Sequence, residues 1–183
     1  MRRAVGSGRQ LVRRLDDGVE EVLDRFRGHP MADRLFYGAS ALGDHSLIWL
    51  ILGALRGLRS EHDWKAAVRI GAGMGIESAL VNLGIKSLFR RSRPSSERSR
   101  PLPLRQPRSS SFPSGHATSA FVGAALLSED DPLWPAYYAT AVVVAFSRVY
   151  VGIHHASDVL GGVAVGVVLG RFGRRLAPLP PRR

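Results

Sequence analysis

The chain contains five mostly apolar stretches that are close to membrane-helix length but carry ionisable residues. They cover roughly residues 35–55, 66–89, 114–127, 133–151 and 159–176. Several are shorter than the ~20 residues that an α-helix needs to cross a bilayer, and Glu77 and Arg171 lie within two of them. The pattern predicts an all-α fold, a multi-pass membrane helical bundle of about five spans. A helical bundle packed in water is the alternative.

Glycines at four-residue spacing favour close helix packing within a membrane. Gly162, Gly166 and Gly170 follow this spacing in the last apolar stretch, and Gly71 and Gly75 repeat it in the second. Small residues at such positions let helices approach closely in lipid, whereas in water each glycine costs a helix about 1 kcal/mol relative to alanine. The spacing therefore supports the membrane bundle over the soluble one.

Residues 9–27 have the pattern of an amphipathic helix. Apolar side chains recur three or four positions apart, with arginines and acids elsewhere: Val12, Leu15, Val19, Val22, Leu23 and Phe26. Such a helix lies on another apolar surface, here a bilayer or the rest of the domain. The basic start of the chain runs into Gly, Ser and Gln rather than into an apolar run, so no signal peptide is expected.

The charge of the chain indicates an anionic partner. Lysine and arginine number 26 against 15 acids, which gives a net charge of +11. Phosphate substrates, anionic lipids and nucleic acids all satisfy this balance. The chain has no cysteine, which excludes disulfides and thiolate metal sites.

A first motif places two cations before a proline, in Lys86-x6-Arg93-Pro94. Seven residues are two helical turns, so the cations share a face if a helix continues to Arg93, although Pro94 favours an extended backbone there. The fork of an arginine and the point charge of a lysine together suit a phosphoryl group. The alternative is a basic cluster at lipid headgroups, because residues 90–111 are expected to form an Arg-, Ser- and Pro-rich loop with further arginines: Arg90, Arg91, Arg98, Arg100, Arg105 and Arg108.

A second motif, Pro113-Ser114-Gly115-His116, predicts the start of a helix. Ser114 is a natural N-cap, and Gly115 is the first helical residue. The free backbone N–H groups and the positive end of the helix dipole bind phosphate. His116 can then donate a proton to a leaving oxygen and later accept one from water. The alternative is an ordinary capping turn followed by a surface histidine.

A third motif, Ser147-Arg148-x5-His154-x3-Asp158, supplies a nucleophile. His154 and Asp158 are four residues apart and are expected on one helix face, where the carboxylate accepts the Nδ1 proton and leaves Nε2 free to attack phosphorus. Arg148 can neutralise the phosphoryl oxygens as charge shifts. A partial metal site formed with His155 is the alternative, although neighbouring side chains on a helix point about 100° apart.

The order and spacing of the three motifs resemble the type 2 phosphatidic acid phosphatase (PAP2) family, which shares its pattern with bacterial acid phosphatases and vanadium haloperoxidases. The family pattern Lys-x6-Arg-Pro, Pro-Ser-Gly-His, Ser-Arg-x5-His-x3-Asp is matched at all eleven specified positions. The resemblance implies that His154 forms a phosphohistidine, that His116 is the general acid and that Asp158 orients His154. It also implies no metal, no cofactor and a phosphate-binding set of five residues: Lys86, Arg93, Ser114, Gly115 and Arg148.

The resemblance extends to the organisation and the activity of the chain. Residues 1–30 are expected to form the basic amphipathic helix, 31–176 the PAP2-like catalytic membrane domain and 177–183 a Pro/Arg-rich tail. The expected protein is an integral membrane lipid phosphatase that hydrolyses a terminal phosphate, monoester or pyrophosphate, of a phospholipid or polyprenyl-linked lipid. The expected partners are this lipid phosphate and the bilayer, and no nucleic acid.

Two other functions are compatible with parts of the pattern. A soluble or peripheral PAP2-type acid phosphatase that acts on small phosphomonoesters would use the same residues. A non-enzymatic basic protein that binds anionic lipid or nucleic acid would account for the charge alone. The chain lacks the interleaved aromatic and basic residues of a single-strand binding platform, which disfavours this second alternative.

Charge bias and family resemblance disagree on which face of the cell membrane carries the site. If residues 86–108 and 147–158 lie on one side, five spans place the N-terminus there too, together with 17 of the 26 basic residues. Basic residues favour the cytoplasmic side, whereas the resemblance implies the outer face.

Four polar residues in the apolar stretches are expected to have supporting roles. Glu77 is expected to pair with Arg69 or with a cation of the site, because an ionised group inside a membrane needs a partner. Asp44 and His45 are expected to mark the end of a span or a contact near the lipid entrance. Glu77, Asp44 and His45 are not predicted to be catalytic.

Overall fold

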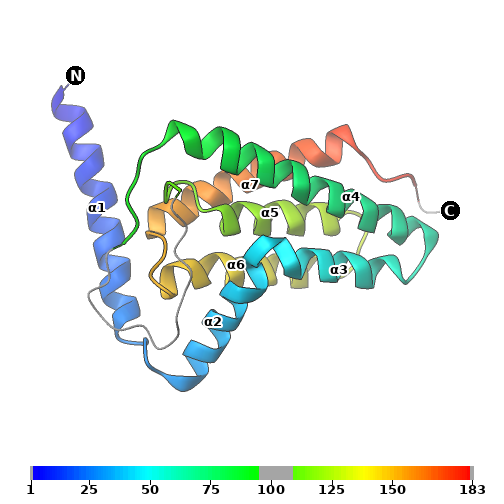
Figure 1. The fold of residues 1–183 in the computed structure, drawn as a ribbon, viewed down its shortest axis with the longest axis horizontal. Coiled ribbons are helices and arrows are strands. Elements are labelled where there is room, and N and C mark those ends of the chain that lie inside the picture. The colour runs from blue at the N-terminus through cyan, green and yellow to red at the C-terminus, as the bar shows by residue number, and fades with distance from the viewer. Residues whose placement is uncertain (1, 95–108, 182–183) are drawn as a thin grey trace.

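The computed structural model describes residues 2–94 and 109–181, and for residues 2–6 it describes the backbone only. The regular structure of this part of the chain is entirely helical, which confirms the predicted fold class (Figure 1). Arginines 98, 100, 105 and 108 of the predicted basic loop lie outside the described residues. In chain order the α-helices are α1 (Arg2–Asp24), α2 (Pro30–Gly43), α3 (Leu47–Gly57), α4 (Glu61–Ala79), α5 (Gly115–Leu127), α6 (Trp134–Tyr150) and α7 (Ala156–Leu176).

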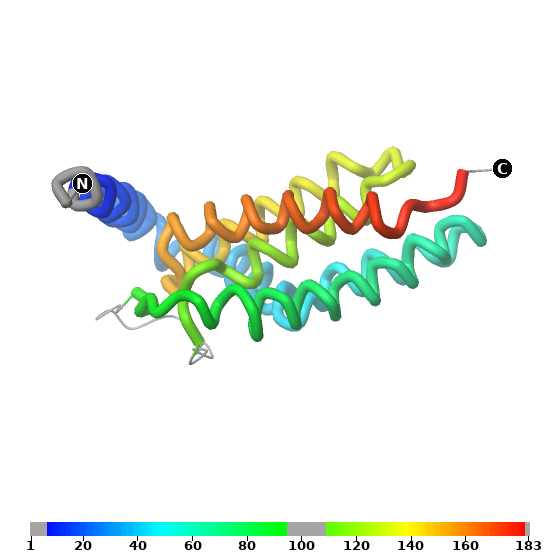
Figure 2. Tube along the Cα trace, turned by 90° about the horizontal axis from the view of Figure 1, so that it is seen from above, coloured from blue at the N-terminus to red at the C-terminus, as the bar shows by residue number. Residues whose placement is uncertain are grey.

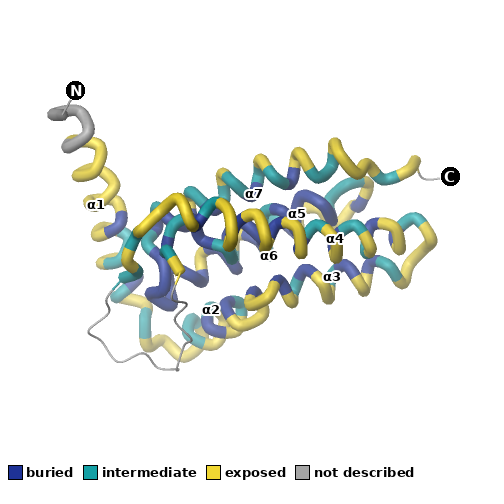
Figure 3. The backbone as a smooth tube through the Cα atoms, turned by 45° about the horizontal axis from the view of Figure 1, so that its top comes forward, coloured by how far each residue is buried: buried dark blue, intermediate teal, exposed yellow. Residues whose placement is uncertain are grey.

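Helix α5 is the centre of the bundle. It packs against α7, α6 and α4, and ten of its 13 residues are buried. Burial is concentrated along α5 and the sides of its neighbours that face it (Figure 3). Trp49 of α3, Ile70 of α4 and Leu127 of α5 are among the fully buried side chains of this core. The remaining faces of α3 and α4 expose large apolar residues, as lipid-facing helices do: Leu47, Leu50, Ile51, Leu55, Val68 and Ile76.

Within residues 2–94 and 109–181, two helical segments are long and apolar enough to cross a membrane. They are Pro30–Gly57, which contains α2 and α3, and Ala156–Leu176, which is α7. Helix α5 is apolar but shorter. The predicted stretches at 66–89, 114–127, 133–151 and 159–176 correspond to α4 with its continuation, α5, α6 and α7.

The glycines of α7 provide its close contact with α5. A Cβ at Gly162 would lie 2.5 Å from the Ser114 carbonyl oxygen, and one at Gly166 would lie 2.7 Å from that of Thr118. The packing predicted from the spacing is therefore confirmed for α7. It is wrong for Gly71 and Gly75, because a Cβ there would meet no described atom within 4 Å.

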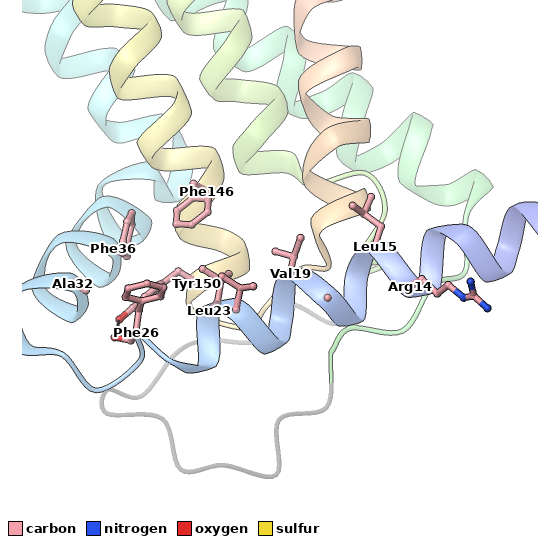
Figure 4. Close-up of a pocket in the computed structure, with 11 residues that line it drawn as sticks. Arg14, Leu15, Val19, Leu23, Phe26, Ala32, Phe36, Phe146 and Tyr150 are labelled. Carbon is pink, nitrogen blue, oxygen red and sulfur yellow. Dashed lines mark hydrogen bonds between the residues drawn. The ribbon is translucent and has the colours of Figure 1, made fainter.

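Helix α1 stands at a steep angle to the bundle and packs across one end of it (Figure 2). Its Val19 and Leu23 join a core cluster that includes Tyr150 at the end of α6. An apolar pocket lies between α1, α2 and α6, with Phe36 and Phe146 on its far side (Figure 4). The predicted amphipathic helix thus lies on the rest of the domain, while Leu11, Val12 and Val22 remain exposed.

Two predicted apolar helices are interrupted, and both interruptions face the same end of the bundle. The stretch 35–55 is divided at Asp44–Ser46, where His45 and Ser46 have positive φ angles of 52° and 60°. Helix α4 continues as a π-helical turn, Leu80–Gly84, and then a 3-10 turn, Ile85–Leu88. The start of α5, the end of α6 and the start of α7 lie at this end, which α1 adjoins (Figure 1).

Candidate active site

A polar cavity of about 280 Å³ opens at this end of the bundle and collects most of the residues singled out by the three motifs. Six of the eight predicted site residues line it: Lys86, Arg93, Gly115, His116, Arg148 and His154. The remaining two, Ser114 and Asp158, are fully buried beside it. Segments that are far apart in the sequence therefore meet at one place.

Lys86 reaches the cavity because α4 changes its winding before the lysine. Lys86 lies in the 3-10 turn Ile85–Leu88, and its Nζ donates to Asn82 Oδ1 at 3.0 Å. A Cβ at Gly115 would lie 3.2 Å from Nζ, so a residue without a side chain allows the ammonium to approach the start of α5. Lys86 therefore points at the positive end of α5. An anion bound there would neutralise both the lysine charge and the helix dipole.

Arg93 does not share a helix with Lys86. The helix ends at Leu88, Phe89 is extended, and Arg93 follows in an irregular segment. Its Nη1 donates to the Ile153 carbonyl at 3.2 Å and lies 3.1 Å from Nε2 of His154. The two cations of the first motif thus reach the cavity from different elements, because the extended backbone before Pro94 carries Arg93 away from the helix.

The second motif folds as predicted at the start of α5. Ser114 is the N-cap, its Oγ accepts from Ala117 N at 3.4 Å, and Gly115 is the first helical residue. His116 follows in the first turn, with Nε2 2.9 Å from Oδ1 of Asp44. Asp44 lies in the break between α2 and α3, so that break brings a carboxylate to the predicted general acid.

His154 and Asp158 face each other, but the prediction that they share one helix is wrong. His154 lies in the turn before α7, whose N-cap is His155, and Asp158 is in the first turn of α7. Nδ1 of His154 is 3.7 Å from Asp158 Oδ2, and that oxygen also accepts from His155 N at 2.9 Å. The capping box at His155 therefore fixes the carboxylate beside the imidazole.

Arg148 closes the other side of the cavity from the last turn of α6. It is 3% exposed, and its Nη1 donates to Ser40 Oγ of α2. Within the described residues its Nε has no hydrogen-bond partner. A guanidinium with a neutral partner and an unused donor is suited to an anionic ligand.

Burial sets the charge of two groups that lie in the connecting segments. It lowers the pKa of His154 to about 4, with Arg93 and Arg148 adding to the effect and Asp158 opposing it. Burial, together with the same two arginines, also lowers the pKa of Lys86 to about 8. At neutral pH His154 is therefore a neutral imidazole with a lone pair at Nε2, and most Lys86 side chains are charged.

Three contacts at the site were not predicted from the sequence. Asp44 pairs with His116, and Arg91 donates from Nη1 to Asp158 Oδ1 at 2.7 Å. Asp16 of α1 accepts from Arg91 Nη2 at 2.6 Å. Asp44 could have been found from the sequence, because it is a carboxylate inside an apolar stretch. Asp16 could not, because it resembles the other acids of the amphipathic helix.

Glu77 lines the cavity that also contains Lys86, and its pairing with a cation of the site stays a prediction. Arg69, the other predicted partner, instead donates to Glu129 at 2.6 Å. In the described part of the chain, no group of three or more His, Asp or Glu side chains is arranged to hold a metal ion. His155, the residue considered for such a site, caps α7.

Comparison with known proteins agrees with this arrangement. The sequence matches the family model of the PAP2 superfamily over residues 66–179. It is 38% identical over 136 residues to a decaprenylphosphoryl-5-phosphoribose phosphatase of Mycobacterium tuberculosis, covering 73% of each chain. A protein of the same name from Mycolicibacterium smegmatis is 35% identical over 128 residues, covering 68% of this chain and 69% of that protein.

The fold is also similar to a solved membrane phosphatase. The crystal structure of a transmembrane PAP2-type phosphatidylglycerolphosphate phosphatase from Bacillus subtilis matches with a TM-score of 0.67 and 25% identity, covering 94% of this chain and 89% of that one. The chain belongs to the PAP2 superfamily. It is a membrane-associated phosphatase of the PAP2 type.

Proposed function

We propose that this PAP2-type lipid phosphatase removes the terminal phosphate of a polyprenyl-linked sugar phosphate through a phosphohistidine at His154. The observation that carries the proposal is the convergence of three cations and two imidazoles on one cavity. The names of the mycobacterial relatives specify decaprenylphosphoryl-5-phosphoribose, and their similarity supports the same substrate class here.

The phosphate-binding part of the proposal uses charge and the start of α5. Lys86, Arg93 and Arg148 approach the cavity from three elements, so they can contact different oxygens of one phosphoryl group. Gly115 and His116 begin α5, where backbone N–H groups and the helix dipole add further attraction for an anion. Because these groups are fixed before the substrate binds, they stabilise the charge that moves onto the oxygens in the transition state.

In the first chemical step, Nε2 of His154 attacks phosphorus. The N–P bond forms while the bond to the ester oxygen breaks, and the leaving oxygen takes a proton from His116. Asp158, whose Oδ2 lies 3.7 Å from Nδ1, faces the protonated side of the ring and balances the positive charge that develops on it. The dephosphorylated lipid alcohol is the first product.

In the second step, water replaces the histidine at phosphorus. His116 takes a proton from the water, the new P–O bond forms, and the N–P bond breaks to return neutral His154. Inorganic phosphate leaves the cation set. Asp44 Oδ1, 2.9 Å from His116 Nε2, stabilises the protonated imidazole before the leaving oxygen takes its proton.

The test is phosphate release from a panel of lipids in detergent: a polyprenylphosphoryl sugar phosphate, a polyprenyl pyrophosphate, phosphatidic acid and phosphatidylglycerol phosphate. We expect the first to have the highest kcat/KM, without added metal, and His154→Ala to release none. His155→Asn is the matched control, because asparagine keeps the N-cap of α7. Full activity in His154→Ala would exclude the phosphohistidine. A preference for phosphatidylglycerol phosphate, the substrate in the name of the structural neighbour, would change the substrate class.

We further propose that the site faces the cytoplasm. The site and α1 lie at one end of the bundle and the C-terminus at the other (Figure 1). Among the described residues, more basic residues belong to the segments at the site end than to those at the other end, and such residues favour the cytoplasmic side. A topology reporter fused after Arg183 should therefore give an extracytoplasmic signal, and a cytoplasmic signal would place the site on the outer face.

A further inference from the structure

Helix α1 contributes one buried charge to the rest of the protein. Among its described side chains two are buried, Leu23 at 5% and Asp16 at 6% exposure. Burial of Leu23 is expected for an amphipathic helix, whereas a buried carboxylate is costly unless it is paired and hydrogen-bonded. The contacts of Asp16 therefore show what this charge is used for.

Both oxygens of Asp16 are occupied. Oδ1 accepts from the backbone N of Ser157 at 2.8 Å, and Oδ2 accepts from Ser157 Oγ at 2.8 Å and from Arg91 Nη2 at 2.6 Å. Ser157 N belongs to the first turn of α7, where backbone N–H groups have no partner within the helix. Asp16 thus binds the start of the helix that carries Asp158.

Arg91 connects Asp16 to the catalytic pair. Its Nη1 donates to Asp158 Oδ1 at 2.7 Å and to Ser157 Oγ at 2.7 Å. The other oxygen of Asp158 accepts from His155 N and faces Nδ1 of His154. The fully buried Asp158 carboxylate is therefore held by Arg91 on one side and directed at the imidazole on the other.

We propose that Asp16 is a positioning residue for phosphoryl transfer, because it holds and partly neutralises Arg91 and so keeps Asp158 oriented toward His154. The inference rests on the proposed role of His154 as the nucleophile. Without the Asp16 charge, Arg91 acts on Asp158 alone and weakens the electrostatic attraction between this carboxylate and Nδ1, which is 3.7 Å away. The ring then tolerates less well the positive charge that develops as Nε2 bonds to phosphorus.

Attachment of α1 alone does not require this charge. Apolar contacts of Val19 and Leu23 with the α6 end already dock the helix (Figure 4). The carboxylate lies instead at the point of α1 that reaches Arg91 and the first turn of α7. Its neighbour Asp17 is exposed, so the pair offers a test with a matched control in the same helix.

The experiment compares Asp16→Asn with Asp17→Asn in the full-length protein, using the best lipid substrate of the panel. We expect Asp16→Asn to lower kcat ten- to a hundredfold with KM changed less than threefold, and Asp17→Asn to match the wild type. Vanadate takes the five-coordinate shape of the transition state, so its inhibition should weaken in proportion to kcat, whereas inhibition by inorganic phosphate should not change.

A double-variant cycle tests the route through Arg91. If Asp16 acts through Arg91, Asp16→Asn added to Arg91→Gln should lower kcat no further than Arg91→Gln does alone. Additive losses would overturn the proposal, as would a kcat for Asp16→Asn within twofold of the Asp17→Asn value. Equal weakening of vanadate and phosphate inhibition would also overturn it, because that result indicates general damage to the site.

Two further variants keep the test informative. Asp16→Glu retains the charge and should recover part of kcat, and no recovery relative to Asp16→Asn counts against the proposal. If Asp16→Asn does not fold, Asp16→Ser is the second neutral variant and must show the same split between kcat and KM. His154→Ala is assayed in the same series. If it is active, the proposed function is contradicted. If it is inactive while Asp16→Asn behaves like the wild type, only the inference about Asp16 is contradicted.

Discussion

The two ends of the helix bundle both bury arginines, but their partners differ in charge. At the end away from the site, Arg56 Nε donates to Asp63 Oδ1 at 2.8 Å and lies 3.3 Å from Asp131 Oδ2, and all three residues are buried. At the site end, Arg148 is equally buried but bonds the neutral hydroxyl of Ser40. The same residue type is thus neutralised by protein carboxylates at one end and left positive at the other.

The difference separates a charge that joins parts of the fold from one that is proposed to bind phosphate. A buried cation between carboxylates joins the segments that carry them, here the first turn of α4 and the loop before α6. A buried cation with a neutral partner retains its attraction for an anion that arrives from outside. Burial of an arginine does not by itself indicate an anion-binding site. The charge of its hydrogen-bond partner distinguishes a structural arginine from one that can bind an anion.

The largest expected effect is on stability, at the end away from the site. Arg56→Leu leaves Asp63 and Asp131 buried without this cation, so the free energy of unfolding should fall by about 3–5 kcal/mol. Denaturant unfolding in detergent measures the loss, and kcat of the folded fraction should stay within twofold of the wild type. Lys65→Ala, which removes an exposed pair with Glu61, is the control and should change stability by less than about 1 kcal/mol.

The next effect is on catalysis, at the site end. Arg148→Met removes a cation that has a neutral partner, so kcat/KM should fall about 10²- to 10³-fold, the usual loss for one transition-state donor. Stability should not fall, because no carboxylate loses a close partner. A large loss of stability with little loss of activity would reverse the comparison between the two ends.

A smaller effect is expected between the two ends. Gly166→Ala would place a Cβ 2.7 Å from the Thr118 carbonyl, so overpacking should cost about 1–3 kcal/mol. Gly71→Ala meets no described atom and should stabilise the helix by up to about 1 kcal/mol. Unfolding experiments on both variants, with kcat measured in parallel, test this. Equal effects on stability would contradict the α5–α7 contact.

The smallest effect concerns the pH dependence of the site. Because the pKa of Lys86 is lowered to about 8, raising the pH above that value removes its charge, and kcat/KM should fall about tenfold per pH unit. Lys86→Arg keeps the charge and should lose the part of the alkaline limb that begins near pH 8, whereas the fall caused by deprotonation of His116 should remain. At the acid end, kcat/KM should persist down to about pH 4, where His154 becomes protonated and loses its nucleophilic lone pair. An unchanged alkaline limb in Lys86→Arg would assign it to another group.

Local pattern predicted several parts of the structure well, and it failed where the backbone departs from regular helix. The N-cap at Ser114, the start of α5 at Gly115 and the glycine contacts of α7 depend on neighbouring residues or on helical spacing. The predicted shared helix for His154 and Asp158 was wrong, because α7 begins at Ala156. Spacing of four residues brings side chains together in a capped turn as well as in a helix, so the pairing was right although its geometry was not.

The sequence by itself determined which chemical groups are available for a phosphate site. The types, order and spacing of the residues in the three motifs are enough to predict a phosphate site with a histidine pair, because they depend only on local chain geometry and side-chain chemistry. The tertiary structure decided which charges act on one another. Asp44 reaches His116 through a break between two helices, and Asp16 reaches Arg91 across 75 residues. Such contacts depend on how whole helices pack, so no periodicity along the chain predicts them.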